Sequence, residues 1–427
     1  MQEKKYKLIK GGAVYIDGDF KKTDIEIKDG KISRIGEGLE NSSDETEVID
    51  ATDKVVVPGL IDMHVHFREP GYSYKETIKT GSEAAAAGGF VSVCTMPNLN
   101  PAPDSLENLE KQLEIIKKDS HIEVIPFATI TKNRMGNELT DYRVLAPLVA
   151  GFSDDGTGVQ SEEIMLKAMT GIAATDKILA AHCEVEKLLD RGYIHKGDYA
   201  LKNNHRGISS ESEWKEIERD IKLAEVTGCR LHICHVSTKE GVHLIRMAKQ
   251  RGVQVTAETC PHYLTFTDDD LQEDGRFKMN PPIRGQEDRE ALRQGVIDGT
   301  IDVIVTDHAP HALNEKSKGL EKSAMGVVGL ETSFAATYTT MVKSGLMSLE
   351  RLIELMSVVP AKILDLDTKG KLETDGEASL TIIDTEKSFV VDPDGFKTKG
   401  RATPYSGMTL QGVIEQTFYK GQRVYKN

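Results

Sequence analysis

Short apolar runs separated by tight turns occupy both ends of the chain. Near the N-terminus these runs span 6–9, 13–16, 24–27 and 31–35, and Asp17-Gly18 and Asp29-Gly30 are typical hairpin turns. The C-terminal end shows the same pattern over 378–384, 389–391 and 413–419. We therefore predict that residues 1–55 and 366–427 together form one small composite β-sandwich domain.

Between these ends, apolar runs alternate with helix-like segments, as in a parallel α/β fold. Eight runs follow one another: one opening at Val55, then 90–96, 122–130, one ending at Phe152, 178–182, 230–235, 253–257 and 301–306. Helices are predicted between most of them, at 73–87, 106–118, 161–174, 212–227 and 239–250. We expect residues 56–365 to form a (β/α)8 TIM-type barrel. A doubly wound open sheet is disfavoured because no Gly-x-Gly-x-x-Gly motif follows the first strand.

The run that opens the central region carries two histidines spaced two residues apart. Val55–Val57 begins a β-branched stretch that favours a strand, and Pro70-Gly71 punctuates it. In a strand His64 and His66 project from the same face, so their imidazoles can share a metal ion. The alternative is a chance His-x-His in a buried strand.

Composition limits the classes of function. The 54 basic and 68 acidic side chains give a net charge of −14, which argues against non-specific binding to nucleic acid or to anionic membranes. The five cysteines sit in or beside apolar runs, as free thiols do in a reducing cytosol. No apolar run approaches membrane-spanning length. We therefore expect a cytoplasmic protein with neither nucleic acid nor membrane as a partner.

Candidate metal ligands fall at the ends of five predicted strands: His64 and His66 on the first, Asp154 and Asp155 on the fourth, His182 on the fifth, His235 on the sixth and Asp307 on the eighth. The carboxyl ends of barrel strands build the active site, so these side chains should converge. Four histidines and two carboxylates can hold two divalent ions if one carboxylate bridges them, with a position open for shared water or hydroxide. A lone histidine is more often a hydrogen-bonded core residue. Five such strand ends together favour a metal centre.

Neighbouring residues suggest the substrate. Asp307 can act as a ligand alone, or it can also accept a proton from the attacking water as general base. Arg68 offers a fork suited to a carboxylate. Asn98 and Asn280 are neutral groups able to orient amide or carboxylate oxygens, and His311 lies just beyond the last strand. Together they indicate a small anionic substrate.

These residues stand in motifs that resemble the amidohydrolase superfamily and, more closely, dihydroorotases of the bacterial type I class. The motifs cover nearly the whole chain in order: His64-Val-His-Phe-Arg68, Met96-Pro-Asn98, Ser153-Asp-Asp-Gly156, His182-Cys-Glu184, His235-Val-Ser-Thr238, Met279-Asn-Pro-Pro282 and Thr306-Asp-His-Ala-Pro-His311. The resemblance implies reversible cyclisation of N-carbamoyl-L-aspartate to L-dihydroorotate in pyrimidine biosynthesis. It also implies a binuclear zinc centre, the barrel and the composite sandwich.

The resemblance assigns roles by position. It implies one Zn²⁺ held by His64, His66 and Asp307 and a second held by His182 and His235. Many relatives bridge the metals with a carboxylated lysine; this chain has Ser153-Asp-Asp-Gly156 there instead. Spacing does not choose between the two aspartates, and the family match favours Asp155 as the bridge beside a hydroxide.

The substrate contacts are implied in the same way. Arg68, Asn98 and His311 match the binders of the substrate carboxylate. Asn280 and the Met325-Gly326 backbone match the contacts to the ring amide, and residues 310–325 resemble a mobile lid.

Two rival functions differ from this prediction. Dihydropyrimidinases, hydantoinases and allantoinases act on rings that mostly lack a carboxylate, so Arg68, Asn98 and His311 argue against them. A non-catalytic relative acting as a structural partner should have lost ligands, and none is missing from the sequence. The resemblance further implies a homodimer and, in part of the class, aspartate transcarbamoylase as a partner. No nucleotide-binding loop is visible, so we expect no organic cofactor.

Overall fold

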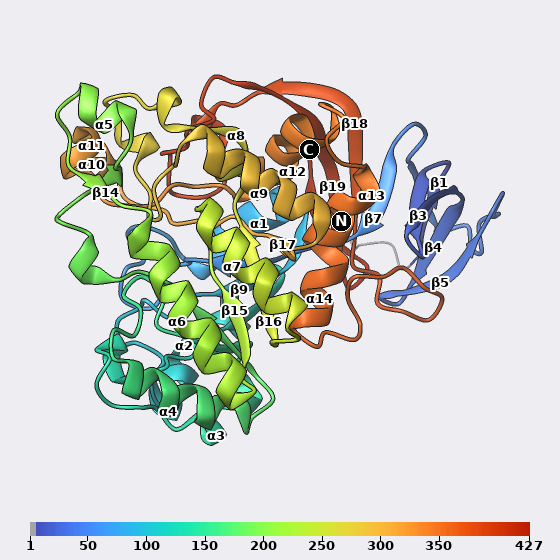
Figure 1. The fold of residues 1–427 in the computed structure, drawn as a ribbon. Helices are drawn as coiled ribbons and strands as arrows, with labels where there is room; N and C mark the ends of the chain where they lie inside the picture. Colours follow the sequence, from blue (N-terminus) through green and yellow to red (C-terminus); the bar gives the residue numbers. More distant parts are fainter. Residues whose placement is uncertain (1–5) are drawn as a thin grey trace.

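Strands from the two ends of the chain lie in one six-stranded sheet. The computed structural model describes residues 6–427, so residues 1–5 of the predicted terminal segment lie outside the described residues. In spatial order the strands are β20 (Gln422–Lys426), β19 (Thr409–Tyr419), β18 (Leu380–Val390), β7 (Val55–Pro58), β2 (Ala13–Ile16) and β3 (Asp19–Lys22). Figure 1 shows the red strands β18 and β19 beside the blue β7.

A second sheet packs against the first. Its order is β5 (Lys31–Gly36), β4 (Asp24–Lys28), β1 (Tyr6–Lys10) and β6 (Glu47–Asp50). A buried apolar cluster joins the two sheets, with Ile9 and Ile25 on one side and Val56, Leu380 and Phe418 on the other. The ends of the chain therefore build a two-layer unit, and the boundary at residue 366 stays a prediction.

The two predicted hairpin turns connect β2 to β3 and β4 to β5. Asp17 and Gly18 have φ values of 54° and 88°, and Asp29 and Gly30 have 48° and 81°. Positive φ at both central positions is what Asp-Gly hairpins adopt. The short strand β3 was not predicted, because Asp19-Phe-Lys-Lys carries a single apolar residue.

One element of the predicted barrel belongs elsewhere. Val55–Pro58 forms β7, which pairs with β2 and β18 in the terminal sheet, so the first barrel strand begins only at Leu60. The division falls at Gly59, where an added Cβ would lie 2.3 Å from a side-chain carbon of Val91. The prediction was wrong here because both strands are buried, so their apolar runs join without a polar break.

Eight parallel strands close the barrel in chain order: β8 (Leu60–Val65), β9 (Phe90–Thr95), β10 (Glu123–Pro126), β11 (Gly151–Ser153), β12 (Ile178–Ala181), β15 (Arg230–Ile233), β16 (Val255–Thr259) and β17 (Val303–Ile304). A parallel bridge from Ala128 to Phe152 joins the third strand to the fourth. The ring closes where the His66 N–H donates to the His308 carbonyl at 2.8 Å. The carboxyl ends of all eight strands therefore face one side of the molecule.

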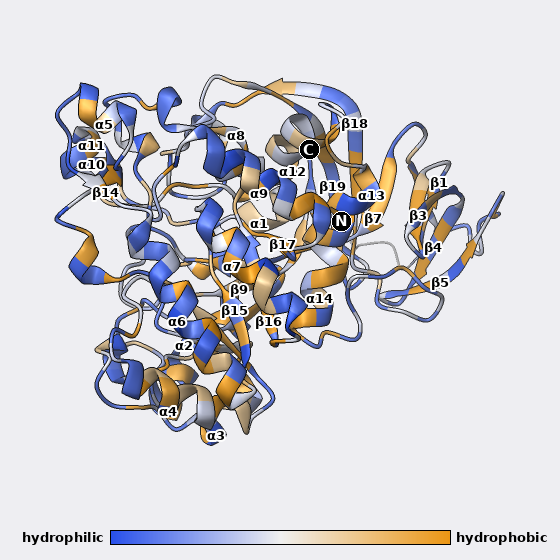
Figure 2. Cartoon of the chain, viewed as in Figure 1, coloured by the Kyte–Doolittle hydropathy of each residue, from blue (hydrophilic) through white to orange (hydrophobic). Residues whose placement is uncertain are grey.

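Helices cover the outside of the barrel: α1 (Ile78–Ala87), α2 (Leu106–Asp119), α3 (Tyr142–Leu145), α4 (Glu162–Ala173), α5 (Asp198–Lys202), α6 (Glu211–Thr227), α7 (Lys239–Gln250), α8 (Pro261–Thr265), α9 (Gln286–Asp298), α10 (Leu313–Lys316), α11 (Gly319–Lys322), α12 (Ser333–Thr337), α13 (Leu349–Ile353) and α14 (Val359–Ile363). Figure 2 shows hydrophilic and hydrophobic residues mixed along α6 and α9, as expected of helices with one buried face. A short ribbon, β13 (Ile194–His195) and β14 (Gly207–Ile208), precedes α6.

The predicted helices agree with the structure within a few residues, except at the start of α1. That helix begins at Ile78 instead of residue 73, because the Thr77 side chain accepts the N–H of Thr80 and caps it. Among residues 6–427, no helix combines the length and apolar character that crossing a membrane requires. All five cysteines are buried and free of disulfides, as expected.

Candidate active site

The predicted ligands meet at the carboxyl ends of the strands. Four imidazole nitrogens lie 3.3–3.5 Å from oxygens of the Asp155 carboxylate, namely Nε2 of His64, His66 and His235 and Nδ1 of His182. Asp307 completes the group, with Oδ1 at 3.1 Å from His66 Nε2 and 3.5 Å from His64 Nε2. All six side chains are buried. The prediction that they converge is therefore correct in this structure.

The spacing of these atoms fits a metal centre better than a hydrogen-bonded network. Ligand atoms bound about 2.0–2.1 Å from a tetrahedral zinc lie about 3.3 Å apart, close to the separations around Asp155. The Nε2 atom of His64, which faces Asp155 and Asp307, is buried and has no hydrogen-bond partner among the described residues. Such an atom is costly unless something binds it. The donor set of imidazoles and carboxylates therefore fits a divalent metal ion.

The two adjacent aspartates have different surroundings. Burial alone would raise the pKa of Asp155, but the imidazoles around it, His64 first, hold it well below its ordinary value. Asp154 turns away and accepts the backbone N–H groups of Ile130 and Thr131. Burial raises the pKa of Asp154 to about 6. Asp155 is thus the carboxylate inside the ligand group, whereas Asp154 holds the loop after β10.

Side chains behind the ligands determine which ring nitrogen faces the centre. Glu258 Oε1 lies 2.6 Å from His64 Nδ1, and the Asn98 Oδ1 atom lies 2.8 Å from His66 Nδ1. A carboxylate and an amide oxygen can only accept, so each Nδ1 carries the proton and each Nε2 offers a lone pair. Asn98, which we predict to bind substrate, therefore also orients the predicted ligand His66 through its oxygen, and its NH2 group remains for other contacts.

A cavity of about 250 Å³ opens onto this group. Every predicted site residue lines it except His64, which is fully buried behind the wall: His66, Arg68, Asn98, Asp155, His182, His235, Asn280, Asp307, His311, Met325 and Gly326. The cavity walls also include Gly156 and Ala309, which were not predicted.

Arg68 is the cation of this cavity. Its side chain is buried, its φ is 57°, and its Nε donates to the Pro310 carbonyl at 3.3 Å. Burial lowers the pKa of Arg68 to about 10, so the guanidinium stays charged at neutral pH. A buried guanidinium without a direct ion pair to a described carboxylate is suited to bind an anionic ligand.

Asn280 and the segment that ends at Gly326 form another part of the cavity wall. The Asn280 Nδ2 atom donates to Glu184, and its buried Oδ1 has no partner among the described residues. Gly326 has a φ of 129°, and an added Cβ would lie 2.7 Å from the Ala309 carbonyl oxygen. A side chain at position 326 would therefore push into the cavity wall.

Residues 310–325, predicted as a lid, contain the short helices α10 and α11 in this structure. Leu320 and Lys316 are buried, and the Lys316 ammonium donates to the carbonyls of Lys278 and Ala324. Burial, aided by Lys278, lowers the pKa of Lys316 to about 7. The segment thus packs against the body, and its mobility stays a prediction.

Three residues close to the site were not predicted: Glu258, Glu184 and Lys75. Glu258 directly follows the seventh apolar run, so the strand-end rule could have found it. Glu184 lies two residues after His182, and its Oε2 is 3.5 Å from His182 Nε2. Nothing in the local sequence marks Lys75, whose contact with His311 joins residues 236 positions apart.

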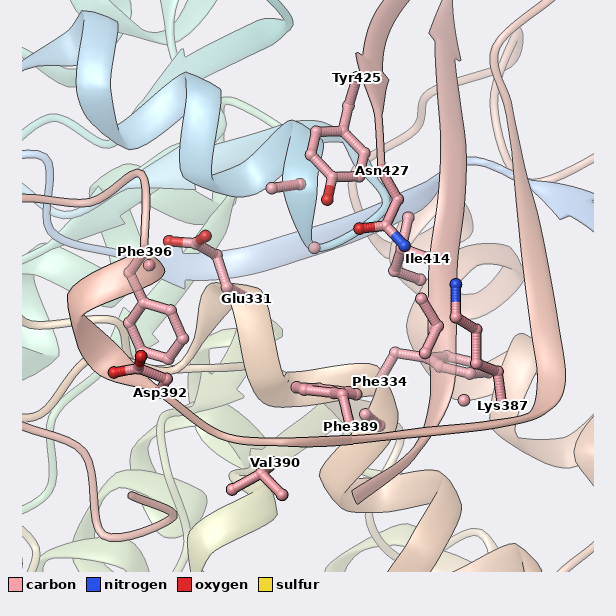
Figure 3. A pocket seen from close by; sticks show the side chains of 16 residues that line it. Glu331, Phe334, Lys387, Phe389, Val390, Asp392, Phe396, Ile414, Tyr425 and Asn427 are labelled. Carbon is pink, nitrogen blue, oxygen red and sulfur yellow. The ribbon is translucent and has the colours of Figure 1, made fainter. Parts of the chain in front are cut away.

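A second hollow, of about 260 Å³, lies away from the strand ends. Figure 3 shows Phe334, Phe396 and Tyr425 around it, with the Glu331 carboxylate between the last two. That carboxylate accepts the backbone N–H groups of Lys397 and Thr398. Glu331 therefore holds a loop, and none of the predicted site residues lines this hollow.

Comparison with known proteins agrees with the site. Residues 53–241 match the family model described as Dihydro-orotase-like. The chain is 47% identical over 419 residues to a dihydroorotase of Fusobacterium nucleatum subsp. nucleatum, covering 98% of both chains. It is 45% identical over 412 residues to a dihydroorotase of Bacillus cytotoxicus, covering 96% of both chains.

Solved structures confirm the predicted fold class. An L-hydantoinase (dihydropyrimidinase) from Arthrobacter aurescens superposes with a TM-score of 0.89 at 27% identity, over 98% of this chain and 96% of that one. A dihydropyrimidinase from Brevibacillus agri superposes with a TM-score of 0.87 at 23% identity, over 99% of this chain and 95% of that one. These likenesses extend over nearly the whole chain, but the much higher sequence identity is to dihydroorotases. This chain therefore belongs to the dihydroorotase family.

Proposed function

We propose that this enzyme interconverts N-carbamoyl-L-aspartate and L-dihydroorotate, a step of pyrimidine biosynthesis. The observation that carries the proposal is the buried Arg68 guanidinium in the same cavity as the His and Asp cluster. A cyclic amide with a carboxylate would place its anion on Arg68 and its amide near Asp307. The dihydroorotases that share 45–47% of the sequence support the same reaction.

We further propose two Zn²⁺ ions per chain, held by the residues that surround Asp155. His64, His66 and Asp307 would hold the first, His182 and His235 the second, and Asp155 both. Two groups of potential ligand atoms within 4.8 Å of one another support a metal centre here: His64, His66 and Asp307, and His64, Asp155 and His235. The first group is the proposed first site, and the second group shares Asp155 and His235 with the proposed second site. When bound, such ions lower the pKa of the attacking water and polarise the ring carbonyl.

The chain's own residues supply binding and proton transfer. In the hydrolytic direction Asp307 accepts the proton of the attacking water and then gives it to the ring nitrogen as the amide C–N bond breaks. Arg68, Asn98 and His311 hold the carboxylate throughout, which keeps the ring in place for attack. Asn280 and the Met325-Gly326 backbone orient the ring amide. Cyclisation is the reverse sequence.

The nearest alternative is a hydantoinase or dihydropyrimidinase, as the similar solved structures are named. Two features of this chain argue against it. The strand end that many relatives use for a carboxylated lysine carries Asp155, and the cavity holds a cation that a neutral ring would leave unpaired.

A comparison of three substrates tests this proposal directly. The purified protein, supplied with zinc, would be assayed with L-dihydroorotate, dihydrouracil and allantoin, and bound metal would be counted. Turnover of dihydroorotate alone is expected. Turnover of the two neutral rings at similar rates would show a broader cyclic amidase and refute the role of Arg68.

Three finer points are proposed with the function: a homodimer, a complex with aspartate transcarbamoylase, and a cytoplasmic location. The five free thiols support the last. Sedimentation of the protein with and without purified aspartate transcarbamoylase tests the first two. A monomer that does not co-sediment would contradict both.

A further inference from the structure

Lys75 connects the loop after β8 to the segment that carries His311. Its Nζ lies 3.2 Å from His311 Nδ1 and 3.0 Å from Glu315 Oε1. The Lys75 side chain is only 15% exposed, so the contact is largely shielded from water. Glu315 is fixed in turn, because its other oxygen accepts the Ala312 N–H at 2.9 Å. One ammonium group thus ties α10 and His311 to the barrel.

This contact determines the protonation of the His311 ring. An ammonium group donates and cannot accept, so Nδ1 of His311 must carry the lone pair and Nε2 the proton. The structure agrees, since Nε2 lies 2.7 Å from the Met325 carbonyl oxygen, the acceptor for that proton. Burial, with the nearby charges of Arg68 and Lys75, lowers the pKa of His311 to about 3. The ring is therefore neutral at pH 7 and presents an N–H beside Met325-Gly326 in the cavity wall.

Removing the Lys75 ammonium would leave His311 Nδ1 next to a group of opposite charge. Glu315 would then remain beside the ring, with its Oε2 3.6 Å from His311 Nδ1. A carboxylate accepts hydrogen bonds, so it would draw the proton from Nε2 to Nδ1 or favour a doubly protonated ring. Either change alters the charge of the ring or its hydrogen bond to the Met325 carbonyl in the cavity wall.

We propose that Lys75 is a positioning residue for substrate binding, which holds His311 as the Nε2–H tautomer and ties α10 to the barrel through Glu315. The consequence for substrate rests on the proposed function, in which His311 binds the substrate carboxylate. Lys75 itself does not line the cavity. Lys75 therefore acts through His311, and its loss should weaken the binding of the ground state and of the transition state equally.

The kinetic test compares three variants. Lys75→Met removes the charge and keeps the aliphatic stem, Lys75→Arg keeps a cationic donor, and Lys399→Met removes an exposed cation that contacts the same loop at Ser73. In Lys75→Met, KM for L-dihydroorotate should rise roughly tenfold, the loss of one hydrogen bond to a charged group. The value of kcat should change less than about twofold, because uniform binding is lost. Lys75→Arg should keep KM close to the wild-type value, and Lys399→Met should have the wild-type KM and kcat.

Two readouts do not depend on the reaction. The ¹⁵N shifts of the His311 ring, assigned with His311→Asn, should report Nε2–H in the wild type and lose that signature in Lys75→Met. Trypsin should cleave after Lys318 or Lys322 faster in Lys75→Met than in Lys399→Met. An unchanged tautomer, or equal effects of the two methionine variants, would overturn the proposal. A wild type inactive on dihydroorotate would refute the proposed function and leave these two readouts decisive for Lys75.

Discussion

The Oε1 atom of Glu258 lies 2.6 Å from Nδ1 of His64, on the side of the imidazole opposite the Asp155 carboxylate. The same oxygen accepts the backbone N–H of His235 at 3.0 Å, and Oε2 lies 3.0 Å from His232 Nε2. One carboxylate therefore supports a residue from each of the two proposed zinc sites.

Replacing Glu258 by glutamine should weaken metal binding. The amide turns one of the two acceptor ends into a donor, so it cannot serve His64, His235 and His232 together. We expect the affinity for zinc to fall roughly 10–100-fold, as for other residues that orient metal-bound histidines. Competition with a chromophoric chelator measures this. The exposed Glu386→Gln variant is the control, and an affinity equal to it would contradict the role of Glu258.

Asp307→Asn tests the proton transfer. The amide keeps an oxygen for a metal but cannot take up the proton, so kcat for dihydroorotate should fall at least about 10²-fold. Metal content and thermal unfolding, measured beside kcat, separate this loss from loss of the centre. Near-normal turnover with full metal content would rule out Asp307 as the base.

Arg68 should control affinity for the carboxylate. In Arg68→Met, we expect KM for dihydroorotate to rise roughly 30-fold or more, because a buried charge pair loses one member. Arg68→Lys keeps the charge without the planar fork, so its KM should lie between those of the wild type and Arg68→Met. Steady-state kinetics decide, and a KM unchanged in Arg68→Met would show that the anion binds elsewhere.

Removing metal should destabilise the fold as well as stop catalysis. An ion that binds only the native state raises the free energy of unfolding. Its removal takes that stabilisation away and leaves buried imidazole nitrogens without a partner. Dialysis against dipicolinate should therefore lower both activity and Tm, and added zinc should restore both. A Tm that does not respond to either treatment would contradict a metal held by the buried cluster.

Lys316 should make stability depend on pH. Its folded-state pKa of about 7 lies below the unfolded value of about 10.4, so the unfolded chain binds more protons between these values. Stability from this residue is therefore greatest above pH 10 and is lost as pH falls through 7. The free energy of unfolding of the wild type, relative to Lys316→Met, should rise from pH 7 to pH 10. Denaturant titrations at pH 6.5, 8 and 9.5 measure it, and parallel pH profiles would contradict the shift.

The sequence predicted the fold best where the local pattern carries the information. The Asp-Gly turns and the long amphipathic helices were found because their signals lie within a few residues. The boundary at Gly59 was missed, because it depends on contact with Val91 and on pairing with β18, which begins more than 300 residues later. Apolar runs alone do not distinguish a strand of one sheet from a strand of the next.

The site was predictable for a related reason. The ends of barrel strands converge regardless of the loops that follow them, so position predicted five ligands and left a sixth open between Asp154 and Asp155. Contacts such as Glu258 with His64 or Lys75 with His311 join distant segments, and no periodicity reports them. The choice between Asp154 and Asp155 likewise depends on which carboxylate meets the N–H groups of Ile130 and Thr131.

The six-stranded sheet joins segments that are synthesised far apart in time. β2 and β7 leave the ribosome long before β18 and β19, and the whole barrel lies between them. The apolar face around Val56 therefore stays uncovered until β18 and β19 have been synthesised. A nascent chain that stalls before residue 380 would carry an unfinished sheet edge, a natural target for chaperones and a cause of aggregation.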